Sequence, residues 1–191
     1  MRPWPTPTAS VRRGRPATTI ARTARVALGS VPAVLEGLRE LGFIADIKGT
    51  RRLLHRERLI DQWTEAYARQ LFPTLEMARF SAASSGWWRR AGIGKYGAQW
   101  GGETAAGLLQ GHLIPEQTMI YADEMPAALL KQHRLRADAS GPVVLRRRFW
   151  NELSTPRLDI VPALLIYADL VADGDARSLA GAKQIRDAYL I

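Results

Sequence analysis

Hydrophobic residues recur at helical spacing in the first third of the chain. In ALGSVPAVLEGLRELGFI, residues 27–44, five apolar side chains lie three or four positions apart: Val31, Val34, Leu35, Leu38 and Leu41. This spacing predicts an amphipathic helix over 30–41. Ser30 is the expected N-cap, Pro32 suits the first turn, and Gly42 is the expected stop.

The elements predicted on either side of this helix have a recognisable order. Residues 18–26 are predicted as a short helix followed by a turn. Residues 44–48 and 51–55 are predicted to pair as a hairpin around Lys48-Gly49-Thr50. The tip of this hairpin would display Lys48, Arg51 and Arg52. Short helix, turn, amphipathic helix and basic hairpin together indicate a winged helix-turn-helix module.

The rest of the chain mixes helical and strand patterns. Residues 57–72 predict a helix with a stripe of large side chains, which Pro73 ends, and AASSG at 82–86 predicts a loop. Beyond it, helices are predicted over 102–109, 162–172 and 176–190, and strands over 117–122 and 143–148. We therefore expect an α+β fold, in which the winged-helix module precedes a mixed domain with a small sheet.

These patterns divide the chain into four segments. We expect a Pro/Arg arm over 1–17, a winged-helix DNA-binding module over 18–56, a connecting helix and loop over 57–85, and an α+β domain over 86–191.

Composition excludes several classes of protein. The chain has no cysteine, so disulfides, thiolate zinc sites and cysteine nucleophiles are excluded. The three histidines, His55, His112 and His133, are too far apart to form a ligand pair at helical spacing. No apolar run reaches the roughly 18 residues of a membrane span, and no hydrophobic segment follows the basic N-terminus. We expect a cytoplasmic protein without a metal or cofactor.

The positive charge is concentrated at one end. Residues 1–58 hold 12 Lys and Arg against 4 Asp and Glu, a net charge of +8. Residues 59–191 hold 15 against 14, a net charge of +1. A basic segment joined to a nearly neutral domain is typical of a nucleic-acid-binding module with a partner domain. A solvated basic tail is the simpler alternative.

The expected DNA contacts follow from this charge and from the predicted helix. Small exposed residues at the start of the 30–41 helix allow a close approach to a groove, and Ala33 could contact a thymine methyl group. No Arg, Asn or Gln in the first turn could read a base, so affinity should come from cations elsewhere. The candidate DNA-binding residues are Ser30, Pro32, Ala33, Arg39, Lys48, Arg51, Arg52, Arg12, Arg13 and Arg15.

Catalysis is not expected from the motifs present. The chain lacks the nucleophile elbow and the phosphate-binding loop. A divergent metal-dependent nuclease using Glu103, Asp123 and Glu124 is a third hypothesis. Such an enzyme would have a lysine two residues beyond a carboxylate on a strand, and IYADEMPAALLKQ, which holds Asp123 and Glu124, lacks that spacing. Glu103 is more simply explained as a helix cap or as a partner of Arg89 or Arg90.

Several spaced blocks give the chain a family resemblance. These are LIDQWTEAYARQLFPTLEMARF, GWWRRAG, WGGETAAGLL, IPEQTMIYADE, RRRFW and VPALLIYADLVADGDARSLAGAKQIRDAYL. Over about residues 19–191 the sequence resembles the AbiEi-type antitoxins of type IV toxin–antitoxin systems, which are transcriptional regulators.

The resemblance implies a function. It implies a winged-helix DNA-binding part, an antitoxin domain, repression of the protein's own operon, and a functional link to a nucleotidyltransferase toxin. Ser30–Leu41 would then be the recognition helix and Lys48–Arg52 the wing. The resemblance implies a further segment ahead of the winged helix, where this sequence has the Pro/Arg arm, and the first helix of a complete winged helix is not evident in it. A dimer or a partner is expected to complete the surface.

Our hypothesis from the sequence is therefore a regulator that binds double-stranded DNA at its own promoter. The alternative from another class is a protein-interaction module that neutralises or scaffolds a partner, with the winged helix as its contact surface.

Overall fold

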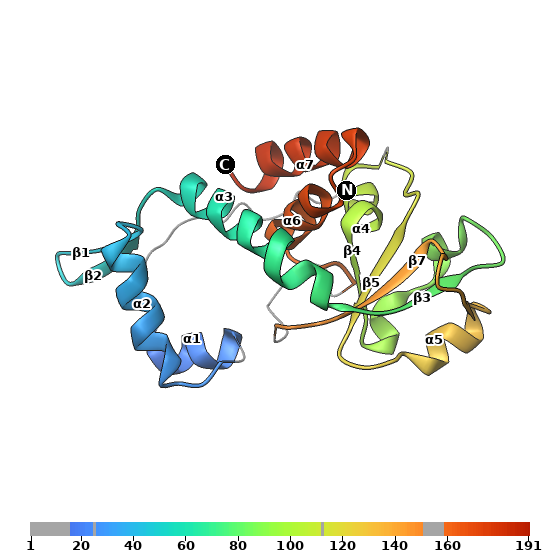
Figure 1. Ribbon diagram of the computed structural model, residues 1–191, viewed down its shortest axis with the longest axis horizontal. Coiled ribbons are helices and arrows are strands. Elements are labelled where there is room, and N and C mark those ends of the chain that lie inside the picture. Colours follow the sequence, from blue (N-terminus) through green and yellow to red (C-terminus); the bar gives the residue numbers. More distant parts are fainter. Residues whose placement is uncertain (1–15, 25, 112, 151–158) are drawn as a thin grey trace. The chain divides into compact units, whose positions relative to one another are not determined.

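The computed structural model describes residues 16–24, 26–111, 113–150 and 159–191 (Figure 1). The fold is α+β, as the sequence predicts, with seven α-helices and two sheets in these ranges. The chain divides into two compact units, and we describe each by itself. The first comprises Met1–Trp63 and Phe149–Ser154, and the second comprises Thr64–Arg148 and Thr155–Ile191.

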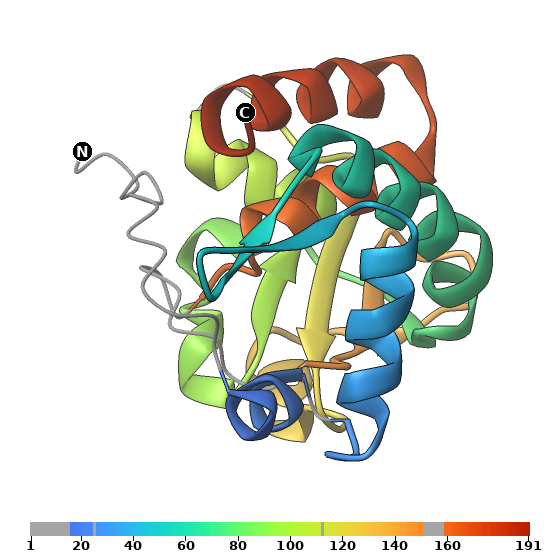
Figure 2. The same cartoon turned by 90° about the vertical axis from the view of Figure 1, so that its left-hand side faces the viewer.

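The first unit contains two helices, a hairpin and most of a third helix. They are α1 (Ala17–Ala24), α2 (Ser30–Glu40), β1 (Ile44–Ile47), β2 (Thr50–Leu53) and α3 (Arg56–Ala66). The two strands pair antiparallel, with Ile44 opposite Leu53 and Ile47 opposite Thr50. Figure 2 shows the hairpin as a narrow ribbon beside α2. The predicted elements of this segment are confirmed to within a few residues at their ends.

The connecting helix ends earlier than the pattern predicts. α3 stops at Ala66 and continues as a π-helical turn, η1 (Tyr67–Leu71), and a 3₁₀ turn, η2 (Phe72–Thr74). Pro73 lies within the 3₁₀ turn and has no amide hydrogen to donate, so the α-helical hydrogen-bond ladder cannot continue through it. The chain leaves this region as a strand.

The second unit is built on a mixed sheet. Its strands are β3 (Glu76–Ser81), β4 (Gln99–Gly101), β5 (Thr118–Ala122), β6 (Arg136–Ala137) and β7 (Val143–Arg147). Their order in the sheet is β4-β5-β7-β3-β6. β5 and β7 run parallel at the centre, and the remaining pairs are antiparallel. The two central strands are the ones predicted from their apolar runs.

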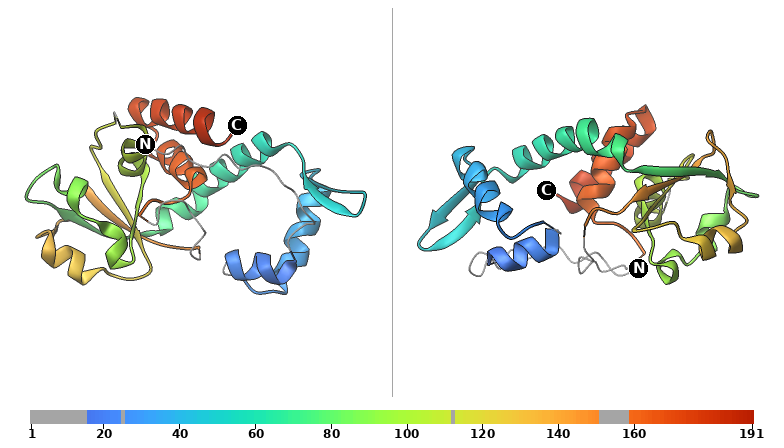
Figure 3. Two further views of the ribbon diagram at one scale, coloured as in Figure 1. Left: turned by 180° about the vertical axis from the view of Figure 1, so that it is seen from behind. Right: turned by 60° about the horizontal axis from the view of Figure 1, so that its bottom comes forward.

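Helices and short turns cover both faces of this sheet. The helices are α4 (Gly102–Gln110), α5 (Ala127–Gln132), α6 (Ala163–Asp173) and α7 (Ala176–Tyr189). Two 3₁₀ turns, η3 (Trp87–Arg90) and η4 (Ile93–Tyr96), lie between β3 and β4. All five residues of β5 are buried, so both of its faces are covered. α6 packs against α4 and α7, while α5 lies beside η4 (Figure 3). The predicted helices 102–109, 162–172 and 176–190 are confirmed.

The start of α7 shows how a local signal fixes an element. The Asp175 side chain accepts hydrogen bonds from the backbone amides of Arg177 and Ser178, at 2.8 and 2.9 Å. These contacts hold the pKa of Asp175 below its usual value, with the bonds to Ser178 as the main cause. Asp175 is therefore the N-cap of α7.

Candidate nucleic-acid interface

The exposed face of α2 carries small side chains. Ser30, Pro32 and Ala33 are exposed in the first turn, whereas Val31 between them is 3% exposed. Ser30 is the first helical residue and not the N-cap, which is Gly29, and no side chain caps this helix. The expectation for Ser30 was wrong because Gly29 already has helical dihedral angles, φ −62° and ψ −22°. The Ser30 side chain stays at the exposed start of the helix.

The apolar stripe of α2 is only partly covered. Val31 is buried, and Leu35 and Leu38 are half-buried. Val34 and Leu41 are each 60% exposed, although the sequence pattern assigns them to the core-facing stripe. The helix has few neighbours in its own unit, so part of its predicted core face remains on the surface.

Arg39 links α2 to the hairpin. Its guanidinium lies 2.9 Å from the Asp46 carboxylate on β1 and also pairs with Glu36 one turn earlier on α2. The hydrogen bond to Asp46 is the main reason that the pKa of Arg39 is raised above its ordinary value. Because two carboxylates share its charge, Arg39 is placed to orient the hairpin against α2 more than to meet a phosphate.

The hairpin turn presents a lysine at its tip. Lys48 and Gly49 form a two-residue turn with φ of +51° and +72°, between the paired residues Ile47 and Thr50. Positive φ at both central residues is the type I′ geometry that matches the twist of a hairpin. Lys48 is exposed, and its side chain therefore projects from the end of the ribbon.

The two arginines of β2 lie on opposite faces of the ribbon. Arg51 is opposite Asp46 and Arg52 is opposite Ala45, and successive side chains of a strand alternate between faces. Arg51 therefore shares the face on which Asp46 meets Arg39, and it is half-buried. Arg52 is exposed on the other face. The predicted group of three cations is thus split, with Lys48 and Arg52 the more accessible pair.

Phe43 holds this unit together. It is 1% exposed, and its backbone bonds to Leu38 at 2.8 Å and to Leu54 at 2.7 Å, which closes the start of the hairpin against the end of α2. The Arg58 guanidinium of α3 lies 5.4 Å from the centre of its ring. These contacts set the position of the hairpin relative to α2.

The predicted arm residues, Arg12, Arg13 and Arg15, lie outside the described residues.

The second unit contains a buried polar cluster that the sequence analysis missed. Asp169 on α6 is fully buried and accepts hydrogen bonds from the hydroxyls of Tyr67 and Tyr121, at 2.6 and 2.7 Å, and from the Gly102 amide at 3.1 Å. Burial raises the pKa of Asp169 to about 6, although these hydrogen bonds oppose the shift. Burial also raises the pKa of both tyrosines. The signal was an acid within the apolar run ALLIYADLV.

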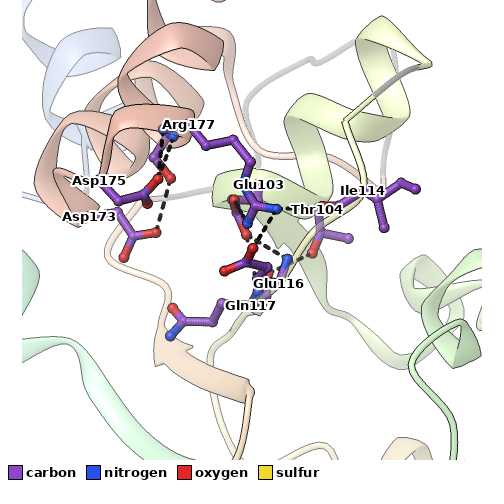
Figure 4. A network of polar contacts seen from close by, with 9 residues as sticks. Glu103, Thr104, Ile114, Glu116, Gln117, Asp173, Asp175 and Arg177 are labelled. Carbon is purple, nitrogen blue, oxygen red and sulfur yellow. Dashed lines mark hydrogen bonds and ion pairs between the residues drawn. The ribbon is translucent and has the colours of Figure 1, made fainter.

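Glu103 is also structural (Figure 4). Its carboxylate accepts hydrogen bonds from the amides of Glu116 and Gln117, at 2.8 and 3.1 Å, and lies 2.6 Å from the Arg177 guanidinium. The expected partners Arg89 and Arg90 were wrong, because the fold brings the start of α7 to the start of α4. Glu103 therefore joins α4, α7 and the segment before β5.

The carboxylates named for a metal-dependent nuclease belong to separate networks. Glu103 pairs with Arg177, and Asp123 pairs with Arg148, while Glu124 is exposed. Within the described ranges, no three His, Asp or Glu side chains gather in a way that could hold a metal ion.

The three consecutive arginines at 146–148 have different surroundings. Arg146 is buried against the Phe72 ring and Arg147 is exposed.

Comparison with known families assigns most of the chain to one family. The family of AbiEi antitoxins, transcriptional regulators of type IV toxin–antitoxin systems, matches residues 52–191. The chain belongs to this family. Neither a curated protein nor a solved structure gives a significant match. Membership of the AbiEi antitoxin family suggests a regulatory role, and the resemblance seen in the sequence is confirmed over residues 52–191.

The match covers the second unit completely and starts within the hairpin. It begins at Arg52 on β2, so α1, α2 and β1 lie before the matched residues.

In the described parts of the chain, no helix combines the length and apolar character needed to cross a bilayer.

Proposed function

We propose that this protein is a DNA-binding antitoxin that represses its own operon through a winged-helix module over residues 18–56. The observation that carries the proposal is the exposed pair Lys48 and Arg52 on the β1–β2 hairpin, beside a helix whose exposed first turn has only small side chains. Membership of a family of transcriptional regulators supports it. Residues 57–85 would connect this module to an antitoxin domain over 86–191.

In this proposal the two parts of the module have different tasks. Ser30, Pro32 and Ala33 face the groove, where small side chains permit close approach but read little sequence. Lys48 and Arg52 bind phosphates on either side of the ribbon, and Arg51 supports them from the α2 face. Arg39 keeps the hairpin in place through Asp46. The arm cations Arg12, Arg13 and Arg15 would add phosphate contacts.

The test is fluorescence anisotropy with a duplex from immediately upstream of the gene and a scrambled duplex, at several salt concentrations. Each phosphate contact contributes about 0.9 to the slope of log K against log salt. Lys48→Gln/Arg52→Gln should therefore lower the slope by about 1.8 and weaken binding to both duplexes. Lys183→Gln, which removes an exposed cation of α7, is the matched control. An unchanged slope would refute the wing assignment.

A second candidate function is a protein-interaction module that neutralises or scaffolds a partner. The exposed apolar residues of the first unit favour it: Val26, Leu28, Val34, Leu41, Ile47 and Leu53. Exposed apolar groups of this kind occur at protein interfaces. A partner that co-purifies after nuclease treatment and is lost in Val34→Ser/Leu41→Ser would support this function.

The proposed link to a nucleotidyltransferase toxin is tested by rescue of growth when both proteins are expressed.

A further inference from the structure

Two segments of the second unit carry positive charge without any acid. Residues 77–102 and 125–137 contain no Asp or Glu, although the unit as a whole is close to neutral. Six exposed cations lie on the short elements of these segments: Arg89, Arg90, Lys95, Lys131, Arg134 and Arg136. Elsewhere in the unit, arginines such as Arg79, Arg148 and Arg177 pair with carboxylates. In the described part of the chain, none of the six cations has an acidic partner within 4.0 Å.

Aromatic rings join the two segments at their centre. The Trp87 ring of η3 lies 5.3 Å from the His133 ring at the end of α5, and the Tyr96 ring of η4 lies 6.5 Å from it. All three side chains are half-buried, so part of each remains accessible. Each of the six cations lies within three positions of one of these rings along the chain, and α5 lies beside η4 (Figure 3). We call these three rings and six cations the aromatic–basic patch.

Two of the patch cations already lie against aromatic rings. Lys95 Nζ lies 4.9 Å from the centre of the Tyr96 ring, and the Arg89 guanidinium lies 5.3 Å from the ring of Trp88, a buried neighbour of the patch. Tyr96 Oη and His133 Nε2 are buried without a hydrogen-bond partner among the described residues. Buried polar atoms of a purely structural cluster are normally paired.

We propose that the aromatic–basic patch binds single-stranded nucleic acid. Unpartnered cations attract a phosphodiester backbone, and half-exposed rings stack on bases that are free of a duplex. A duplex hides the faces of its bases, so it would engage the cations but not the rings. An acidic protein surface would gain little from the rings. The patch lies wholly within the second unit, and the proposal is independent of the wing assignment.

The experiment measures anisotropy of a labelled oligothymidine and a labelled oligouridine of about 12 nucleotides, a length that suits one such site, with the full chain. Each cation contributes about 0.7 to the salt slope for a single strand. Lys131→Gln/Arg134→Gln should lower this slope by about 1.4. Lys183→Gln, also an exposed lysine on a helix and outside the patch, should leave the slope unchanged.

A second pair of variants separates stacking from charge. Tyr96→Leu should weaken single-strand binding by about tenfold at constant salt slope, because one stacked base is lost. Its binding to the upstream duplex should be unchanged. Lys48→Gln/Arg52→Gln should show the reverse, with duplex binding weakened and single-strand binding retained. Circular dichroism at the assay temperature confirms that each variant is folded.

The outcomes are distinct. Loss of single-strand binding in the patch variants alone, with either oligonucleotide, supports the proposal, and a preference between the two identifies RNA or DNA. No binding of the wild-type chain to either strand would overturn it. Equal losses in the patch variants and in Lys183→Gln would also overturn it.

Discussion

At the residue scale, Asp169 shows how burial changes the chemistry of a single side chain. A carboxylate without solvent is stabilised here by three donors, two of them tyrosine hydroxyls that are themselves 2.8 Å apart. Each hydroxyl has one proton, so both can donate to Asp169 only if neither donates to the other. Burial still outweighs these bonds, and the pKa of Asp169 is about 6. The cluster ties the turn after α3 to α6 and β5.

This pKa predicts how stability depends on pH. The folded protein binds the Asp169 proton between the ordinary pKa of 3.8 and about 6, whereas the unfolded chain does not. The contribution of Asp169 to stability is therefore complete below pH 3.8 and falls as the pH rises to about 6, by about 3 kcal/mol. Above pH 6 it stays constant.

Asp169→Asn isolates this contribution. Asparagine does not titrate, so the free energy of unfolding of Asp169→Asn relative to wild type should rise by about 2 kcal/mol between pH 4 and pH 7. Urea denaturation at a series of pH values measures it. The control Asp187→Asn makes the same change at an exposed acid of α7. Parallel profiles for wild type and Asp169→Asn would contradict the assigned pKa.

At the element scale, two helical glycines have opposite roles. A Cβ at Gly107 in α4 would lie 2.3 Å from the Leu113 carbonyl oxygen, so the absence of a side chain lets the following segment pass close to the helix. A Cβ at Gly37 in α2 would meet nothing within 4 Å. The same substitution therefore has different consequences in the two helices.

Alanine at these positions should change stability in opposite directions. Gly37→Ala should stabilise the protein by about 0.5–1 kcal/mol, because alanine restricts the unfolded chain and favours helix. Gly107→Ala should destabilise it by about 1–3 kcal/mol or more, because the backbone at Leu113 must move. Thermal unfolding followed by circular dichroism measures both. A Gly107→Ala variant as stable as wild type would show that the segment moves without cost.

At the scale of the whole molecule, the core is distributed unevenly. Among the largest fully buried side chains of the described residues, Phe43 alone belongs to the first unit. All the others belong to the second unit, among them Tyr121, Ile166 and Leu170. Since buried apolar area supplies most of the stability of a fold, the second unit should be the more stable one.

Hydrogen exchange can test this difference. Amides of α2, β1 and β2 should exchange faster than those of β5 and β7, because the first unit opens at a lower free energy. Mass spectrometry of peptides covering 30–53, 118–122 and 143–147 compares them in one experiment. DNA binding should slow exchange in the first peptide only. Equal protection in the free protein would mean that the two units unfold together.

Patterns in the sequence predict some features of this fold and miss others. Helices and strands followed from periodicity, because the spacing of apolar residues reflects which face is buried. The position of Ser30 and the end of α3 at Ala66 were missed, since the ends of helices depend on dihedral angles and on neighbours outside the local pattern. The Asp169 cluster was missed because its hydroxyl donors, Tyr67 and Tyr121, lie 102 and 48 positions away.

The sequence by itself determined the α+β class, the family and the concentration of positive charge before residue 59, because periodicity, composition and motif order are properties of the chain alone. Only the tertiary structure decided which charges are paired. It placed Arg177 against Glu103, divided Arg51 from Arg52, and left the cations around Trp87 and His133 without acidic partners among the described residues. The physical reason is that a charge interacts over a few ångströms in space, and folding sets those distances.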